Sequence, residues 1–189
     1  MALIAEELVE EWLNRKFYFT IRGLKQGNHE MDLLAISHIG DQIHRCHYEV
    51  SVSMRPVGYI SELTKEGQSE LGVKSAKTAA KRPHHILKQS VASWVEKKFH
   101  HPVRTAMRDK CLPGGEWECT FVHGVANYPE ELAMIRDHGV QTLNINTVID
   151  ELLGMKEAMA TSSIGREIID VIRIREQLGN SDRQLNFAQ

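Results

Sequence analysis

Apolar side chains in the first part of the chain recur at helical spacing. Ala5, Leu8, Val9, Trp12 and Leu13 form the stripe, and glutamates fill the positions between them. This pattern is typical of an amphipathic helix and predicts one over residues 5–16. Runs rich in β-branched and aromatic residues follow at 17–24, 31–37 and 42–53, separated by turns that contain glycine. We therefore expect a helix and then a three-stranded meander.

The remaining sequence alternates helical and strand patterns. Residues 61–81 suggest a loop or short helices, 85–99 a helix, and 116–123 a strand after a Pro-Gly-Gly break. A helix opened by Pro129 and closed by Gly139 precedes a short strand at 141–146. Helical segments continue to about Leu178, with a break near 162–165 and a frayed end. This order predicts an α/β fold with a mixed sheet covered by helices, comprising a domain over 1–150 and a helical C-terminal extension over 151–189.

The third predicted strand has one apolar and one polar face. A period of two separates Tyr48, Val50 and Val52 from the polar set, which is His47, Glu49, Ser51 and Ser53. An apolar core would not need that second set, so its regular spacing raises the question of a functional surface.

Two acidic residues, Asp32 and Glu49, fall on neighbouring predicted strands. Adjacent strands lie about 4.8 Å apart, so two carboxylates on one face can share a divalent cation. Hard oxygen ligands suit Mg²⁺ or Mn²⁺. The alternative is that both residues are charges at strand ends, and spacing alone favours that alternative.

Composition places the chain among single globular domains in a reducing compartment. The chain has 189 residues, of which 42% are hydrophobic, and three cysteines without a CxxC pair. We see no cationic leader and no apolar run of the roughly 18 residues that a membrane span requires. We therefore expect a soluble, cytoplasmic protein without a membrane partner.

Charge is distributed unevenly along the chain. From Lys74 to Lys110 there are ten Lys or Arg residues against Glu96 and Asp109, a balance of +8 within a chain of net charge -2. Such a block suits a polyanion partner, because each cation near a phosphate releases condensed counterions. A solvated helix surface explains the charge equally well.

Residues 6–53 resemble the restriction-endonuclease-like PD-(D/E)xK nuclease superfamily, especially its resolvase-like and type IV restriction-like branches. "AEELVEEWLNRKFYF" matches the family's helix, "GNHEMDLLAI" its first acidic motif and "HYEVSVS" its second. The resemblance implies that Asp32 and Glu49 are metal ligands, with the carbonyl of Val50 as a third. Glu6 matches the helix glutamate, and Glu10 is its substitute.

One position departs from the family pattern, because Ser51 stands where the resemblance would place a catalytic lysine. A serine hydroxyl donates a hydrogen bond but brings no positive charge to the phosphate. The lysine has either moved elsewhere, with Lys74, Lys77 and Lys88 as sources, or been lost with the activity. Gln89 matches a glutamine found in some branches. The predicted nucleic-acid-binding residues are Lys74, Lys77, Lys81, Arg82, Lys88, Gln89, Lys97 and Lys98.

The sequence leaves three functions open. The resemblance implies a Mg²⁺-dependent or Mn²⁺-dependent nuclease acting on DNA, with Asp32, Glu49, Ser51, Lys74 and Lys77 as the catalytic candidates. The second is an inactive nucleic-acid-binding or scaffold protein that retains the nuclease fold. The third is a protein-interaction module whose helical tail forms a homodimer.

Overall fold

A five-stranded mixed sheet forms the centre of the protein. The computed structural model describes residues 2–53, 58–155 and 163–186, and side chains only as far as 175. The strands are β1 (Phe19–Gln26), β2 (His29–Ile39), β3 (Gln42–Ser51), β4 (Glu118–His123) and β5 (Val140–Asn144), in the order β1-β2-β3-β4-β5. The first three strands pair antiparallel, and β4 and β5 join them in parallel.

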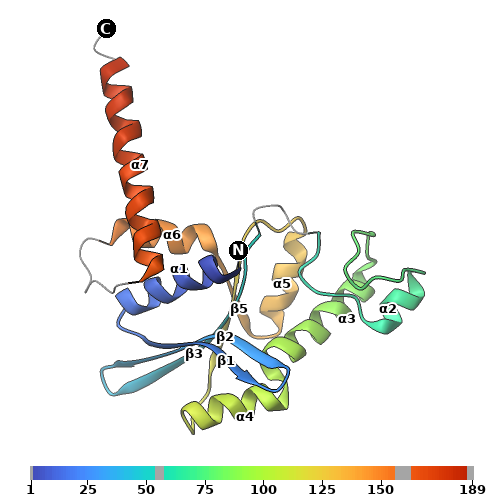
Figure 1. Ribbon diagram of the computed structural model, residues 1–189. Helices are drawn as coiled ribbons and strands as arrows, with labels where there is room; N and C mark the ends of the chain where they lie inside the picture. The colour runs from blue at the N-terminus through green and yellow to red at the C-terminus, as the bar shows by residue number, and fades with distance from the viewer. Residues whose placement is uncertain (1, 54–57, 156–162, 187–189) are drawn as a thin grey trace.

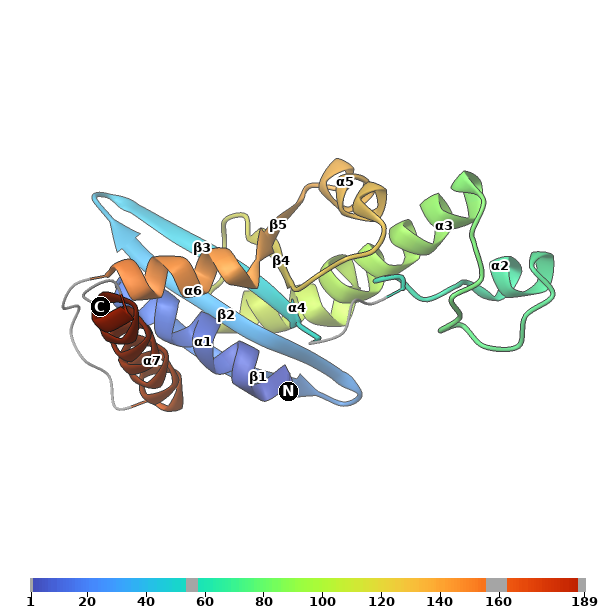
Figure 2. The same cartoon turned by 90° about the horizontal axis from the view of Figure 1, so that it is seen from above.

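Helices cover both faces of this sheet (Figure 1). On one face lie α1 (Ala2–Arg15), α6 (Ile145–Gly154) and the start of α7 (Ile164–Asn186). The other face carries α3 (His84–Val95), α4 (Pro102–Cys111) and α5 (Pro129–Asp137). A π-helical turn, η1 (Glu96–His100), joins α3 to α4. Helix α2 (Lys65–Glu70) lies beyond α3, away from the sheet (Figure 2).

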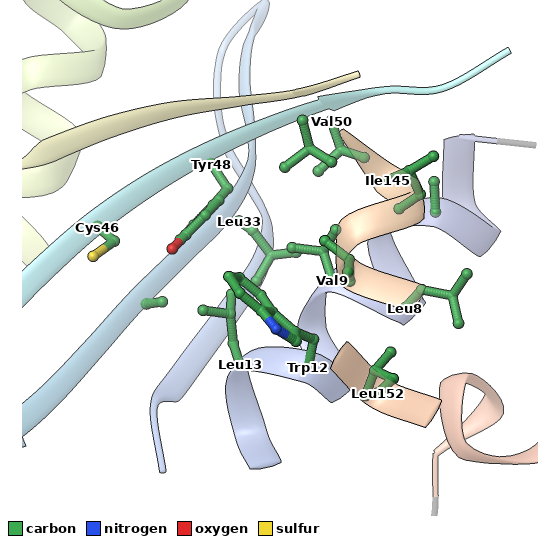
Figure 3. Close-up of a cluster of buried hydrophobic side chains, with 14 of the residues drawn as sticks. Leu8, Val9, Trp12, Leu13, Leu33, Cys46, Tyr48, Val50, Ile145 and Leu152 are labelled. Atoms are coloured by element: carbon green, nitrogen blue, oxygen red, sulfur yellow. The ribbon is translucent and has the colours of Figure 1, made fainter. Parts of the chain in front are cut away.

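The largest apolar cluster lies between α1, α6 and the sheet (Figure 3). Val9 and Leu13 of α1 pack there against Leu33 of β2 and Tyr48 of β3. The buried stripe of α1 is the one that helical spacing predicts. Val50 belongs to the same cluster, so the apolar face predicted for the third strand is confirmed.

The predicted α/β layout is confirmed, although one helix was missed and several elements have other bounds. No helix was predicted over 102–111, where α4 begins at Pro102 in the favoured first position. The third strand ends at Ser51 instead of Ser53. The last strand ends at Asn144, whose side chain caps α6, and α7 continues to Asn186, well beyond Leu178. The predicted break lies partly outside the described residues.

The C-terminal helices contact the sheet domain directly. Ile169 of α7 is fully buried in the cluster beneath α1, and Ser163 Oγ donates to Glu11 Oε2 at 2.5 Å. A domain boundary between 150 and 151 stays a prediction. Among the described helices, none combines the length and apolar character needed to cross a membrane.

Candidate functional site

Asp32 lies where the β2–β3 ladder ends. The last paired residues are Leu33 and Tyr48, and beyond them Asp32 Oδ2 accepts a hydrogen bond from the Val50 amide at 2.7 Å. Met31 packs beneath α4 although Leu33 packs beneath α1, so strict alternation is interrupted at this point of β2. The Asp32 carboxylate is thereby attached to the backbone of the strand that carries Glu49.

Glu49 is the centre of a buried charge network. Its side chain projects from the polar face of β3 and is almost inaccessible to solvent. Lys98 Nζ lies 2.5 Å from Glu49 Oε2, while Arg104 Nη1 and His47 Nε2 both contact Oε1, the histidine at 3.1 Å. The polar face predicted for the third strand therefore faces cations from η1 and α4.

His47 connects Glu49 to a second buried arginine. Arg108 Nη1 lies 3.3 Å from His47 Nδ1 and 3.4 Å from Cys119 Sγ. A guanidinium donates and does not accept, so Nδ1 is the acceptor and Nε2–H is left to donate to Glu49. Arg108 thus selects one tautomer of the neutral imidazole. Burial is the main cause that lowers the pKa of His47 below its ordinary value.

Arg104 joins the two sides of the network. The same Nη1 that contacts Glu49 donates to the carbonyl of Lys98 at 2.9 Å. Lys98 lies in η1, and such π-turns change the direction of the side chains that follow in a helix. Arg104 therefore fixes the position of the Glu49 carboxylate relative to the backbone of Lys98.

Asp32 and Glu49 have opposite electrostatic environments. Burial, together with repulsion from Glu49, raises the pKa of Asp32 from 3.8 to about 7. Burial would also raise the pKa of Glu49, but the hydrogen bond from His47 and the charges of Lys98 and Arg104 lower it below its ordinary value. Opposed shifts in neighbouring carboxyls are typical of functional sites, although buried ion-pair networks also produce them.

Glu6 and Glu10, the two glutamates of α1 that match the family's helix glutamate, have different surroundings. Burial raises the pKa of Glu6, with smaller contributions from the charges of Glu30 and Glu49, so Glu6 lies within electrostatic range of the site. Glu10 instead accepts from Thr20 Oγ1 at 3.0 Å, which directs it toward β1. In the described ranges, no three His, Cys, Asp or Glu side chains form a group able to hold a metal.

A magnesium ion could still be held by fewer protein ligands. Mg²⁺ usually keeps several waters and binds through one or two carboxylates. Asp32, Glu49 and the Val50 carbonyl supply the hard oxygens that such an ion prefers. The raised pKa of Asp32 also fits a carboxyl whose ionised form lacks sufficient positive charge nearby.

A cleft of about 730 Å³ opens beside Lys98 and Ser51. Lys77 and Lys97 line it with both of these residues, and both lysines lie near Glu62, at 3.3 Å and 3.9 Å. Lys77, a predicted catalytic residue, therefore contacts Glu62. The lysine that contacts Glu49 is Lys98. The other predicted nucleic-acid-binding residues that are exposed lie outside the cleft lining: Lys74, Lys81, Lys88 and Gln89.

Arg82 also lines this cleft, but it is a buried structural residue. Its guanidinium lies 3.9 Å from the centre of the Tyr59 ring, and its Nη1 donates to the Ser61 carbonyl at 2.9 Å. Glu131 of α5 accepts from Ile60 N and Ser61 N, each at 2.7 Å. These contacts attach the wall of the cleft to α5.

Sequence reasoning missed Arg104 and Arg108, and assigned Lys98 only to nucleic-acid binding. A signal for α4 was present, because Val103, Met107 and Cys111 recur every fourth residue after Pro102. The inward direction of the two arginines had no comparable signal, since charged residues usually face solvent.

Comparisons with known proteins add little to this geometry. No protein family matches the chain, and no curated protein does. Among solved structures, the chain is similar to a protein of unknown function named AF1548, at 12% identity and a TM-score of 0.44. The similarity covers 80% of this chain and 67% of that one. It assigns neither a family nor a function.

Proposed function

We propose that this protein is a metal-dependent nuclease that cleaves DNA phosphodiesters. The observation that carries the proposal is the contact between Glu49 and Lys98, a residue that also lines the basic cleft. Lys98 supplies the positive charge that Ser51 lacks. In this proposal the catalytic lysine comes from the turn after α3 instead of from β3.

Each residue of the site has a distinct role in this proposal. Asp32, Glu49 and the Val50 carbonyl would hold Mg²⁺ or Mn²⁺, with Glu6 within electrostatic range of the site. A bound divalent ion supplies Lewis acidity and lowers the pKa of water. Lys98 stabilises negative charge developing on the phosphate, and the exposed Ser51 hydroxyl offers it a hydrogen bond.

The cleft gives the substrate a path to Lys98 and Ser51, which line it. Lys77 and Lys97 are largely exposed, with 81% and 71% of their side chains accessible. Cations in such positions contact backbone phosphates without reading sequence. The expected substrate is therefore DNA bound through its backbone, with the reacting phosphate near Lys98.

Nicking of plasmid and branched DNA with Mg²⁺ or Mn²⁺ tests the proposal. The wild type should cleave, whereas Asp32→Ala and Lys98→Ala should lose at least about a hundredfold in rate, the usual loss for one charge-stabilising group. Lys88→Ala is the matched control, because Lys88 is exposed, lies outside the cleft lining and does not contact Glu49. Cleavage that survives Asp32→Ala, or equal loss in both lysine variants, would refute this assignment.

A second function is favoured by the number of cations around Glu49. Lys98 engages one carboxylate oxygen, and Arg104 and His47 engage the other. A metal ion would have to replace one of these partners, so the network also suits an inactive protein that binds nucleic acid. In that case the wild type binds DNA without cleaving it under either metal, and Ser51→Lys should create weak cleavage that depends on Asp32.

A further inference from the structure

Over residues 164–175, whose side chains the structure describes, helix α7 has two apolar sides, and one of them packs against the protein. Gly165, Ile168, Ile169 and Ile172 face α1 and α6, and a Cβ on Gly165 would lie 2.5 Å from the Glu7 carbonyl. Ile164, Val171 and Ile174 are instead 58%, 65% and 56% exposed. A helix needs one apolar face to pack on its own domain, so the second face is unexplained by the fold.

The exposed side follows a heptad spacing. Ile164 and Val171 are seven residues apart, and the sequence continues that interval with Leu178 and Leu185. Ile174 lies three residues after Val171, which gives the a and d positions of a coiled coil. At 1.5 Å per residue the helix is about 35 Å long, and it extends away from the sheet domain (Figure 1). The apolar interval therefore continues into the part of α7 that projects.

The direction of the second side leaves room for another helix. At about 100° per residue, the exposed stripe lies roughly 130° around the axis from the centre of the buried face. A second helix packed on the exposed stripe would lie on the side of α7 that faces away from the sheet domain. Two copies joined through α7 would consequently carry their domains on the outer sides of the pair.

Charges beside the stripe favour a parallel pair of identical helices. With Val171 at position a, Asp170 takes position g and Arg175 position e. In a parallel dimer the g residue of one helix faces the e residue five positions later on the other. Asp170 of each copy would therefore face Arg175 of the other copy. We propose that α7 forms a parallel, two-stranded coiled coil with α7 of a second copy of this chain.

Two d positions of this heptad are polar, Ser181 and Glu167, and Glu167 weakens the interface more because it is charged. It is exposed in α7 and occupies the d position between Ile164 and Val171, where two copies would place like charges together. Glu167→Leu should therefore strengthen the dimer. A stronger dimer in this variant cannot be explained by a loss of folding.

Sedimentation equilibrium of the full chain between 1 and about 100 μM tests the proposal. The wild type should shift from the 21.5 kDa monomer to a species of twice that mass as concentration rises. Ile174→Glu should raise the dimer dissociation constant at least about a hundredfold, because each dimer carries the change twice. Ile39→Glu is the matched control, since Ile39 is also 56% exposed but lies at the end of β2.

A charge exchange tests the parallel register. Asp170→Arg and Arg175→Asp should each weaken association, and the double variant should restore most of it. A wild type that stays monomeric throughout, an Ile174→Glu variant that still dimerises, or a double exchange that restores nothing would overturn the proposal. Far-UV circular dichroism of each variant confirms that the exposed substitutions leave the helix content unchanged.

Discussion

Replacing Asp32 with asparagine should stabilise the fold at pH 8, although it should abolish metal-dependent cleavage. Asparagine has the same shape, and its side-chain oxygen can still accept the Val50 amide. It removes the negative charge that burial and Glu49 disfavour. The carboxylate that we propose as a metal ligand is therefore also a source of instability, a common relation at active sites.

The magnitude follows from the pKa of Asp32. The carboxyl keeps its proton up to about pH 7 in the folded chain, whereas its ordinary pKa is 3.8. Between these values the folded state binds more protons than the unfolded state, so the free energy of unfolding falls as the pH rises. One pKa unit corresponds to about 1.4 kcal/mol, which gives a total loss of about 4 kcal/mol above pH 7. Asp32→Asn does not undergo this loss.

Urea unfolding in EDTA at pH 5, 6, 7 and 8 measures the difference. The variant should exceed the wild type most at pH 8 and progressively less toward pH 5. Asp41→Asn, in the exposed turn after β2, is the control and should change little. Millimolar Mg²⁺ should then stabilise the wild type and not Asp32→Asn. A variant no more stable than the wild type at pH 8, or an advantage independent of pH, would refute the reasoning.

Three further predictions concern the network and the cleft. Arg104→Met should lower the free energy of unfolding by about 3–5 kcal/mol in urea, because it leaves a buried carboxylate with fewer cations. Glu131→Gln should cost about 2 kcal/mol in the same assay, since the buried amides of the cleft wall lose a charged acceptor. Lys77→Glu combined with Lys97→Glu should weaken DNA binding in EDTA and reduce its salt slope by about 2, whereas Lys88→Glu, outside the cleft, should reduce it less.

The sequence predicted those features that depend on local periodicity. The buried stripe of α1 and the two faces of β3 follow from spacings of 3.6 and 2, and the structure has both. The pairing of Lys98 with Glu49 could not be read in this way, because the two residues are 49 positions apart and meet only through the fold. Local spacing does not say which of several lysines reaches a given carboxylate.

The run of basic residues from Lys74 to Lys110 also shows what a local sequence pattern does not predict. Of its ten cations, Arg82, Arg104 and Arg108 are buried, so they cannot act as a surface for phosphates. Each finds its partners from distant parts of the chain: Ser61 and Tyr59 for Arg82, and β3 residues for the other two. Net charge along a sequence therefore overestimates the positive surface that the folded protein presents.

The order of the strands also has a consequence for how the chain folds. The helix α1 and the antiparallel strands β1 to β3 occupy the first 51 residues and are joined by tight turns. Contacts between sequence neighbours close quickly, whereas the parallel addition of β4 must wait for a long crossover. Asp32 and Glu49 should consequently come together before Lys98 and Arg104 arrive. We expect folding to pass through a step whose rate increases with salt, because screening relieves the repulsion between two carboxylates that do not yet have their cations.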